Sequence, residues 1–175
     1  QRRAVQGEHA GRGRPAERRD DAELLGQAAH LVEQGIVALQ TAIRHPDAVD
    51  RLVLVSGAMS KQGFFPEGIT AFDQLESHAD AYGPGLKASP MGQAYPDVDW
   101  TRLFRKTGEL TKRDYDWSAD VAKVRARTLL VFADADAQRA EHMIAFWKAL
   151  GGGQRDAGLD GSLRPPSQFA IVPGA

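Results

Sequence analysis

The chain of 175 residues contains no cysteine, which excludes disulfide bonds and thiolate chemistry and fits a reducing or an oxidising compartment equally well. It also lacks any apolar run close to the ~18–20 residues of a membrane-spanning helix, and its first residues lack the hydrophobic core of a signal peptide. The formal net charge is only −1, so the total charge favours neither a nucleic acid nor an anionic membrane as partner. We therefore expect a soluble, cytoplasmic protein that binds neither.

Residues 1–34 lack lysine, isoleucine and aromatic residues, although they include six arginines. Such a segment offers too little apolar surface to offset the entropy of ordering it, so residues 1–19 are predicted to be a disordered, arginine-rich arm. Acidic residues are interspersed, which favours a solvated tail over a phosphate-binding segment. From Asp20 the apolar spacing becomes helical and continues to Arg44, as one long helix or as two helices that meet at Gly35.

A buried strand is predicted at residues 51–56. Pro46 cannot continue a helix and restricts the residue before it, so the preceding helix must end near Arg44. The following run Leu-Val-Leu-Val, residues 52–55, is apolar at every position. Such a run is typical of a central parallel strand whose two faces are both covered by helices.

Two more strands are predicted nearer the C-terminus, at residues 128–132 and 168–172. Between them an apolar stripe predicts a helix from about Arg139 to Leu150, and the three glycines at 151–153 favour its end because glycine adopts the left-handed conformation readily. A strand, a helix and a second strand in this order predict a right-handed parallel crossover. The pattern as a whole indicates an α/β fold.

The intervening residues 57–118 hold nine of the thirteen aromatic residues and several glycine and proline breaks. Short helices are predicted near residues 70–78 and 100–110, without the regular α/β order of the flanking segments. The aromatic residues there fit two interpretations, the core of a helical layer or the lining of an apolar pocket.

The stretch Thr41–Gly57, in which a helix of small residues is followed by Pro-x-x-Val-x-x-Leu-Val-Leu-Val, resembles the segment after the nucleophile in the α/β-hydrolase family. The resemblance extends from about Gly35 to Ala175. It implies a partial α/β-hydrolase fold, with a short parallel sheet, flanking helices and a helical lid insertion. Residues 20–57 and 119–175 would form the incomplete core, and residues 58–118 the cap or lid.

The resemblance implies a catalytic acid on the loop after the strand at 128–132. Enzymes of this family use a nucleophile, an acid and a histidine in that chain order, and the acid lies in a motif similar to Gly-Asp-x-Asp. The second aspartate of that motif falls on Asp136, with Asp134 as turn former and second choice. The alternative interpretation is a pair of aspartates that caps the helix beginning at 139.

The other two members of the triad have no counterpart in the sequence. Val32 stands where the family has its serine, and its neighbours include neither glycine of the Gly-x-Ser-x-Gly elbow; Ser56 and Ser60 are the only nearby serines. The family's histidine follows a Pro-Gly after the last strand, and this sequence stops at Ala175, one residue beyond Pro173-Gly174. His142 is interpreted as a helix-surface residue. The nucleophile is therefore unassigned, the catalytic histidine is absent, and we hypothesise a truncated or frame-altered chain.

By descent the expected function is hydrolysis of a small apolar ester or a related acyl or carbon–carbon substrate, with a non-catalytic remnant or interaction module as the alternative. The 175-residue chain alone is expected to be inactive. We expect no cofactor and no metal, since the histidines are scattered and no glycine-rich loop follows a strand. We also expect self-association through an exposed sheet edge. The candidate pocket residues are Phe64, Phe65, Phe72, Trp100, Phe104 and Trp117.

Overall fold

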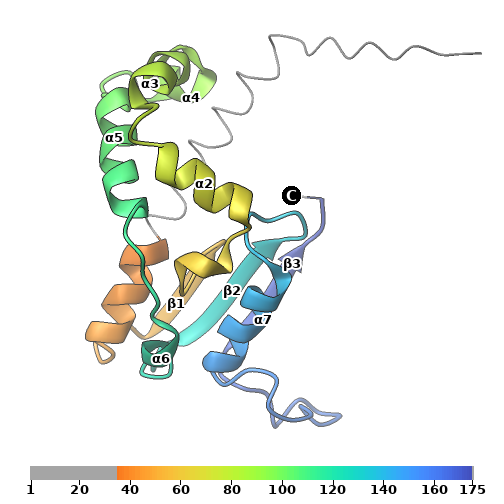
Figure 1. Ribbon diagram of the computed structural model, residues 1–175. Coiled ribbons are helices and arrows are strands. Elements are labelled where there is room, and N and C mark those ends of the chain that lie inside the picture. Colours follow the sequence, from red (N-terminus) through yellow and green to blue (C-terminus); the bar gives the residue numbers. More distant parts are fainter. Residues whose placement is uncertain (1–34, 175) are drawn as a thin grey trace, which may run out of the picture.

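The computed structural model describes residues 35–174, so the predicted arm, the predicted helix before Gly35 and Val32 lie outside the described residues. Residues 35–44 are helical. The further elements, in chain order, are β1 (Arg51–Val55), η1 (Lys61–Gly63), α2 (Pro66–Gln74), α3 (Ala79–Ala88), α4 (Pro90–Ala94), α5 (Trp100–Thr111), α6 (Ser118–Val121), β2 (Arg127–Ala133), α7 (Ala140–Ala149) and β3 (Gln168–Val172). Figure 1 shows their arrangement.

The three strands form one parallel sheet in the order β1-β2-β3. Leu54 of β1 is level with Leu130 of β2, which in turn is level with Phe169 of β3. The predicted parallel, adjacent strands are thus confirmed. β1 ends one residue earlier than expected and β2 extends one residue further at each end.

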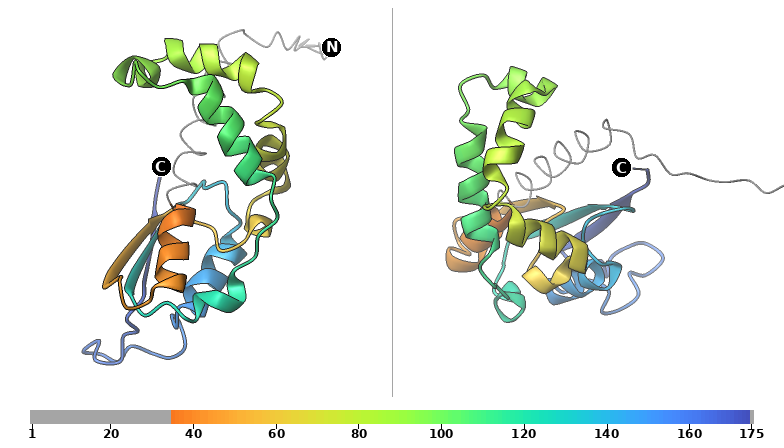
Figure 2. Two further views of the ribbon diagram at one scale, coloured as in Figure 1. Left: turned by 90° about the vertical axis from the view of Figure 1, so that its left-hand side faces the viewer. Right: turned by 45° about the horizontal axis from the view of Figure 1, so that its top comes forward.

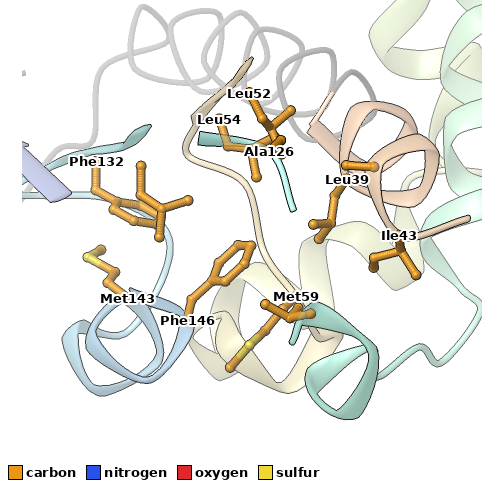
Figure 3. Close-up of a cluster of buried hydrophobic side chains, with 12 residues drawn as sticks. Leu39, Ile43, Leu52, Leu54, Met59, Ala126, Phe132, Met143 and Phe146 are labelled. Atoms are coloured by element: carbon orange, nitrogen blue, oxygen red, sulfur yellow. The ribbon is translucent and has the colours of Figure 1, made fainter. Parts of the chain in front are cut away.

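One face of the sheet is covered by the helix at residues 35–44 together with α6 and α7, which lie side by side on it (Figure 2). The apolar stripes of these helices meet the inward side chains of the strands (Figure 3). This cluster includes Leu39, Ile43, Leu52, Leu54, Met59, Val121, Leu130, Phe132, Met143 and Phe146. The prediction that the helix before β1 packs on the sheet is confirmed for its described part.

The opposite face of the sheet is open among residues 35–174. Val53 and Val55 of β1 are 60% and 46% exposed, whereas Leu52 and Leu54 are buried. Since side chains alternate between the two faces of a strand, the run Leu-Val-Leu-Val is buried at every second position only. Within residues 35–174, helices cover one face of this strand; the expectation of a second covering layer is not tested by these residues, because the predicted helix before Gly35 lies outside them.

Helices α2 to α5 form a layer of their own between β1 and β2 in the chain (Figure 1). α2 begins at Pro66, earlier than predicted, because proline is well suited to the first turn of a helix. α5 is capped by Asp99, whose carboxylate accepts a hydrogen bond of 3.0 Å from the Arg102 amide. None of the helices described in residues 35–174 is long and apolar enough to cross a membrane.

The two ends of this layer meet in a short neck, which consists of residues 59–61 and 115–117. The Lys61 amide donates to the Tyr115 carbonyl at 3.0 Å, and the Trp117 amide donates to the Met59 carbonyl at 2.9 Å. The side chain of Lys61 is buried, and its ammonium lies 2.6 Å from the carboxylate of Asp73 on α2. The chain thus leaves the sheet and returns to it at one place.

Candidate active site

The candidate site lies where β1 and β2 end at the carboxyl side of the sheet. Ser56 directly follows β1, and Asp136 lies three residues beyond the end of β2. The Ser56 hydroxyl donates a hydrogen bond of 2.6 Å to Oδ2 of Asp136. Two residues 80 positions apart in the sequence are therefore in direct contact.

Two backbone amides also donate to the Asp136 carboxylate. The Ala133 amide donates to Oδ2 at 3.3 Å, and the Gln138 amide donates to Oδ1 at 3.2 Å. No side chain caps α7, whose N-cap residue is Arg139. The alternative interpretation, in which the aspartate pair caps this helix, is therefore wrong: the Asp136 carboxylate is bound by its own loop and by the end of β1.

Gln138 is the residue of the site that the sequence did not indicate. The residue is 1% exposed, and its side-chain amide nitrogen donates to the Ser56 carbonyl at 2.6 Å. Its side-chain oxygen has no hydrogen-bond partner within residues 35–174. Gln138 thus joins the loop after β2 to the end of β1 through the Ser56 carbonyl.

The backbone of Ser56 adopts φ +49°, and no other non-glycine residue of the described part has a positive φ. This conformation is unfavourable for a residue with a Cβ and persists where the surroundings fix it. Here the hydroxyl, through Asp136, and the carbonyl, through Gln138, are both held. Ser60, the other nearby serine, is buried and pairs through its backbone with Asp116 instead.

Asp134, the second-choice acid, is exposed and has a different partner. Both of its carboxylate oxygens lie 3.1 Å from the amide of Gly174, which follows β3. The Asp134 amide in turn donates to the Val172 carbonyl at 3.1 Å. Asp134 therefore fixes the turn after β3 to the turn after β2.

His142 is buried rather than on the helix surface, so that interpretation is wrong. The residue is 8% exposed, and its Nε2 accepts a hydrogen bond of 3.3 Å from the Met59 amide. The ring lies against Gly63, where a Cβ would come within 2.4 Å of it. Burial lowers the pKa of His142, the positive charge of Arg139 lowers it further, and Asp116 opposes both. Its contacts are those of a neutral, structural histidine.

The six predicted pocket residues fall into separate places. Phe64 and Phe72 are buried in edge-to-face contact, with ring centroids 5.1 Å apart, and Trp117 packs against the same cluster. Trp100 and Phe104 are buried in another cluster, between α3 and α5. Phe65 is exposed.

Two surface cavities border these aromatic residues. One, of about 320 Å³, is lined by Gln62, Phe64, Pro66, Ile69, Thr70 and Arg139; the other, of about 460 Å³, is lined in part by Trp100. The first is close to the lower limit of ordinary ligand pockets, ~300–1,000 Å³. In the part of the chain that the structure describes, no group of histidine, aspartate and glutamate side chains is arranged to hold a metal ion.

Among the comparisons with known proteins, only the comparison with solved structures finds matches. No protein-family model and no curated protein matches the chain. An α/β-hydrolase enzyme, MGS-M2, from a Medee basin deep-sea metagenome library has a TM-score of 0.51 at 16% identity, over 79% of this chain and 53% of that one. The enol-lactonase from Burkholderia xenovorans has a TM-score of 0.48 at 13% identity, over 81% and 54%. The acetylester hydrolase from Corynebacterium glutamicum also has a TM-score of 0.48 at 13% identity, and the match covers 81% of this chain and 51% of that one.

The chain spans about half the length of the solved structures it matches. At these identities the similarity concerns the fold and not the reaction. The three-stranded parallel sheet in chain order, with its helices, is part of the α/β-hydrolase fold. The predicted fold class is thereby confirmed.

Proposed function

We propose that this chain is the acid-bearing part of an α/β-hydrolase that cleaves a small apolar ester or a related acyl or carbon–carbon bond, with Asp136 as the acid of the triad. The observation that supports this most is the set of three donors on the Asp136 carboxylate, from Ser56, Ala133 and Gln138. A triad acid must be held in one orientation, because its task is to fix the tautomer and direction of an imidazole.

The carboxylate of Asp136 retains the capacity for that task. Its two oxygens offer about four lone-pair positions in all. Oδ2 accepts from the Ser56 hydroxyl and the Ala133 amide, whereas Oδ1 accepts from the Gln138 amide alone. Oδ1 is therefore the atom to which an imidazole N–H would donate. Ser56 acts in this proposal as a positioning residue that holds the acid.

The substrate preference rests on the aromatic residues of the helical layer. Phe64 and Ile69 line the smaller cavity, and the exposed ring of Phe65 lies next to Phe64 in sequence. Such a surface favours an apolar acyl or alcohol group. Phe72 and Trp117 would support this wall from behind, whereas Trp100 and Phe104 would hold the layer together.

A non-catalytic chain is the second candidate, and one observation favours it. Within residues 35–174, no histidine contacts the Asp136 carboxylate, and the buried His142 binds the Met59 amide instead. A triad acid without an imidazole has nothing to orient. By itself the 175-residue chain would then be inactive and would persist, if at all, as an interaction module.

The test compares turnover of a short-chain chromogenic ester by several forms of the protein. The unextended chain should not exceed buffer, and Asp136→Asn should change nothing. Adding only a C-terminal histidine should not restore activity. A form with both an upstream segment that contains a nucleophile elbow and the C-terminal histidine should turn over, and Asp136→Asn should then lower kcat by about 10⁴-fold, as in other serine hydrolases.

Asp134→Asn is the matched control, since it makes the same change in the same loop and leaves the Asp136 carboxylate in place. If Asp134→Asn abolished turnover of the extended form and Asp136→Asn did not, Asp134 would be the acid of the triad. Hydrolysis by the unextended chain that Asp136→Asn abolishes would reveal a nucleophile within it, and labelling with a fluorophosphonate would identify Ser56 or Ser60 as that group.

A further inference from the structure

A short antiparallel contact joins the helical layer to the loop that carries Asp136. Residues 62–65 lie between the neck and α2, and residues 137–139 directly follow Asp136. Phe64 and Gln138 form an isolated antiparallel bridge between the two segments. We name these two segments, residues 62–65 and 137–139, the base–loop contact.

Three hydrogen bonds accompany this bridge. The Phe65 amide donates to the Ala137 carbonyl at 3.1 Å, and the Arg139 amide donates to the Gly63 carbonyl at 2.9 Å. The guanidinium of Arg139 also donates to the Gln62 carbonyl. Because these bonds join two short segments, the segments separate only when all of the bonds break. The base–loop contact is therefore expected to open as one unit.

Gln138 extends this contact to the candidate acid. Its backbone amide donates to Oδ1 of Asp136 at 3.2 Å, and its side chain donates to the Ser56 carbonyl at 2.6 Å. Oδ1 is the atom to which an imidazole N–H would donate in the proposed triad. The base of the helical layer and the orientation of the acid are therefore coupled through one residue.

The ring of His142 lies against the same contact. A Cβ at Gly63 would come within 2.4 Å of the ring, and Nε2 of His142 accepts the hydrogen bond from Met59 in the neck. This nitrogen accepts a hydrogen bond only while it carries no proton. On protonation Nε2 becomes a donor that faces the N–H of Met59, so the bond is lost in a buried place. Protonation of the ring therefore destabilises the closed base–loop contact.

Two charged groups act on this ring, Arg139 at the start of α7 and Asp116 in the neck. Burial lowers the pKa of His142 most, Arg139 lowers it further, and Asp116 opposes both. When the contact opens, water reaches the ring and its pKa returns toward the ordinary value of about 6.5. Opening therefore takes up a proton, and a fall in pH below about 6.5 favours it.

We propose that His142 is a positioning residue for the loop of Asp136, and that protonation of its ring opens the base–loop contact while the sheet stays folded. The neutral ring holds the helical layer to the acid, and the protonated ring releases it. This inference rests on the proposed function only for the role of Asp136. Its test measures hydrogen exchange and not turnover, so the two proposals can fail separately.

The experiment is amide hydrogen exchange of the full 175-residue chain, followed by NMR between pH 7.5 and pH 5. The reporters are the amides of Phe65 and Arg139, which bond across the contact. Their opening constant, corrected for the pH dependence of intrinsic exchange, should rise by up to about tenfold per pH unit, the limit for one proton. It should exceed the opening constant of the central β2 amides at every pH and should not change in dilute urea, because little surface is exposed.

His142→Gln keeps an acceptor for the Met59 amide but does not titrate. The reporter amides of this variant should therefore open equally at every pH in the range. His45→Gln is the matched control: His45 is exposed in the loop before β1, so the variant should keep the pH dependence of the wild type. The titration of the wild-type chain decides the proposal even if His142→Gln does not fold.

Gly63→Ala tests the same contact from its other side. The added Cβ would displace the ring of His142, so the reporter amides should open about tenfold more at every pH. Gly85→Ala is the matched control, because a Cβ at Gly85 in α3 has nothing within 4 Å. This variant should leave the opening constant of the reporters unchanged.

Three results would overturn the proposal. The first is a pair of reporter amides that open only together with the central β2 amides, which would mean that the base–loop contact has no opening of its own. The second is an opening constant of the wild-type reporters that does not change between pH 7.5 and pH 5. The third is a pH dependence that persists in folded His142→Gln, which would assign the proton to another group.

Discussion

The two faces of the sheet are made by the same three strands, yet only one of them is covered by described helices. Leu54 is 1% exposed on the covered face, and its neighbour Val53 is 60% exposed on the other. The two residues differ little in hydrophobicity. The difference between them therefore arises from the helices at 35–44 and 140–149, whose apolar stripes both lie against the covered face. Burial of a strand residue depends as much on the covering element as on the residue itself.

The largest difference in stability is expected between two variants of β1, each with one side chain truncated, one on the covered face and one on the other face. Leu54→Ala should lower the free energy of unfolding by about 2–5 kcal/mol, since it leaves a cavity among Leu39, Leu130 and Phe146. Val53→Ala should change it by about 0.5 kcal/mol or less, as for most exposed positions. Urea unfolding of both variants, at concentrations where the chain is monomeric, measures the difference. If both variants lost the same free energy of unfolding, the face that carries Val53 would be covered in solution.

An intermediate effect on stability is expected from substitutions of Ser56, the residue that directly follows β1. Ser56→Ala should cost about 1–2 kcal/mol, because it removes a hydrogen bond to a carboxylate at a partly exposed position. Ser56→Gly loses the same bond but relieves the strain of φ +49°. The glycine variant should therefore be the more stable of the two by about 0.5–1 kcal/mol, after allowing for the freedom of unfolded glycine. Thermal unfolding of the pair measures this; the reverse order would show that the positive φ carries no cost.

The smallest effect concerns His142 on the covered side, and it depends on pH. The folded state lowers the pKa of His142 through burial and through Arg139, although Asp116 opposes this. The unfolded chain therefore binds more protons as pH falls through about 6.5, and stability is lost in that direction. His142→Gln keeps an acceptor for the Met59 amide but does not titrate. Its melting temperature should fall less than that of the wild type between neutral pH and about pH 5. If the melting temperatures of the two proteins fall equally over this pH range, groups other than His142 cause the loss of stability.

Much of the fold followed from local patterns. The apolar runs predicted all three strands to within one residue at each end, and the glycines after α7 mark its end with φ +84° at Gly151 and +61° at Gly153. These features depend on residues that are close in sequence, which is why the sequence sufficed for them. That no helix of residues 35–174 covers the second face involves no local signal and was not predicted.

The contacts around the candidate site could not be predicted from the sequence. Asp136 was singled out because the resemblance to the α/β-hydrolase family places the acid of the triad at that position of the loop, but its contact with Ser56 depends on the register between β1 and β2. His142 was misjudged for a similar reason. Its place in the core exists because Gly63, distant in sequence, has no side chain to fill that space. Contacts of this kind require the folded arrangement and have no signature in spacing.

The neck at residues 59–61 and 115–117 determines how strongly the sheet depends on the number of residues between the two halves of the neck. The backbone bonds between Lys61 and Tyr115 and between Met59 and Trp117 hold the ends of the helical layer together at the sheet. Once two ends are fixed, the entropy of closing the loop grows only with the logarithm of its length, by about 0.6 kcal/mol for each doubling. The sheet is therefore nearly indifferent to how many residues lie beyond the neck, and helices there can be added, removed or exchanged while β1 and β2 keep their register.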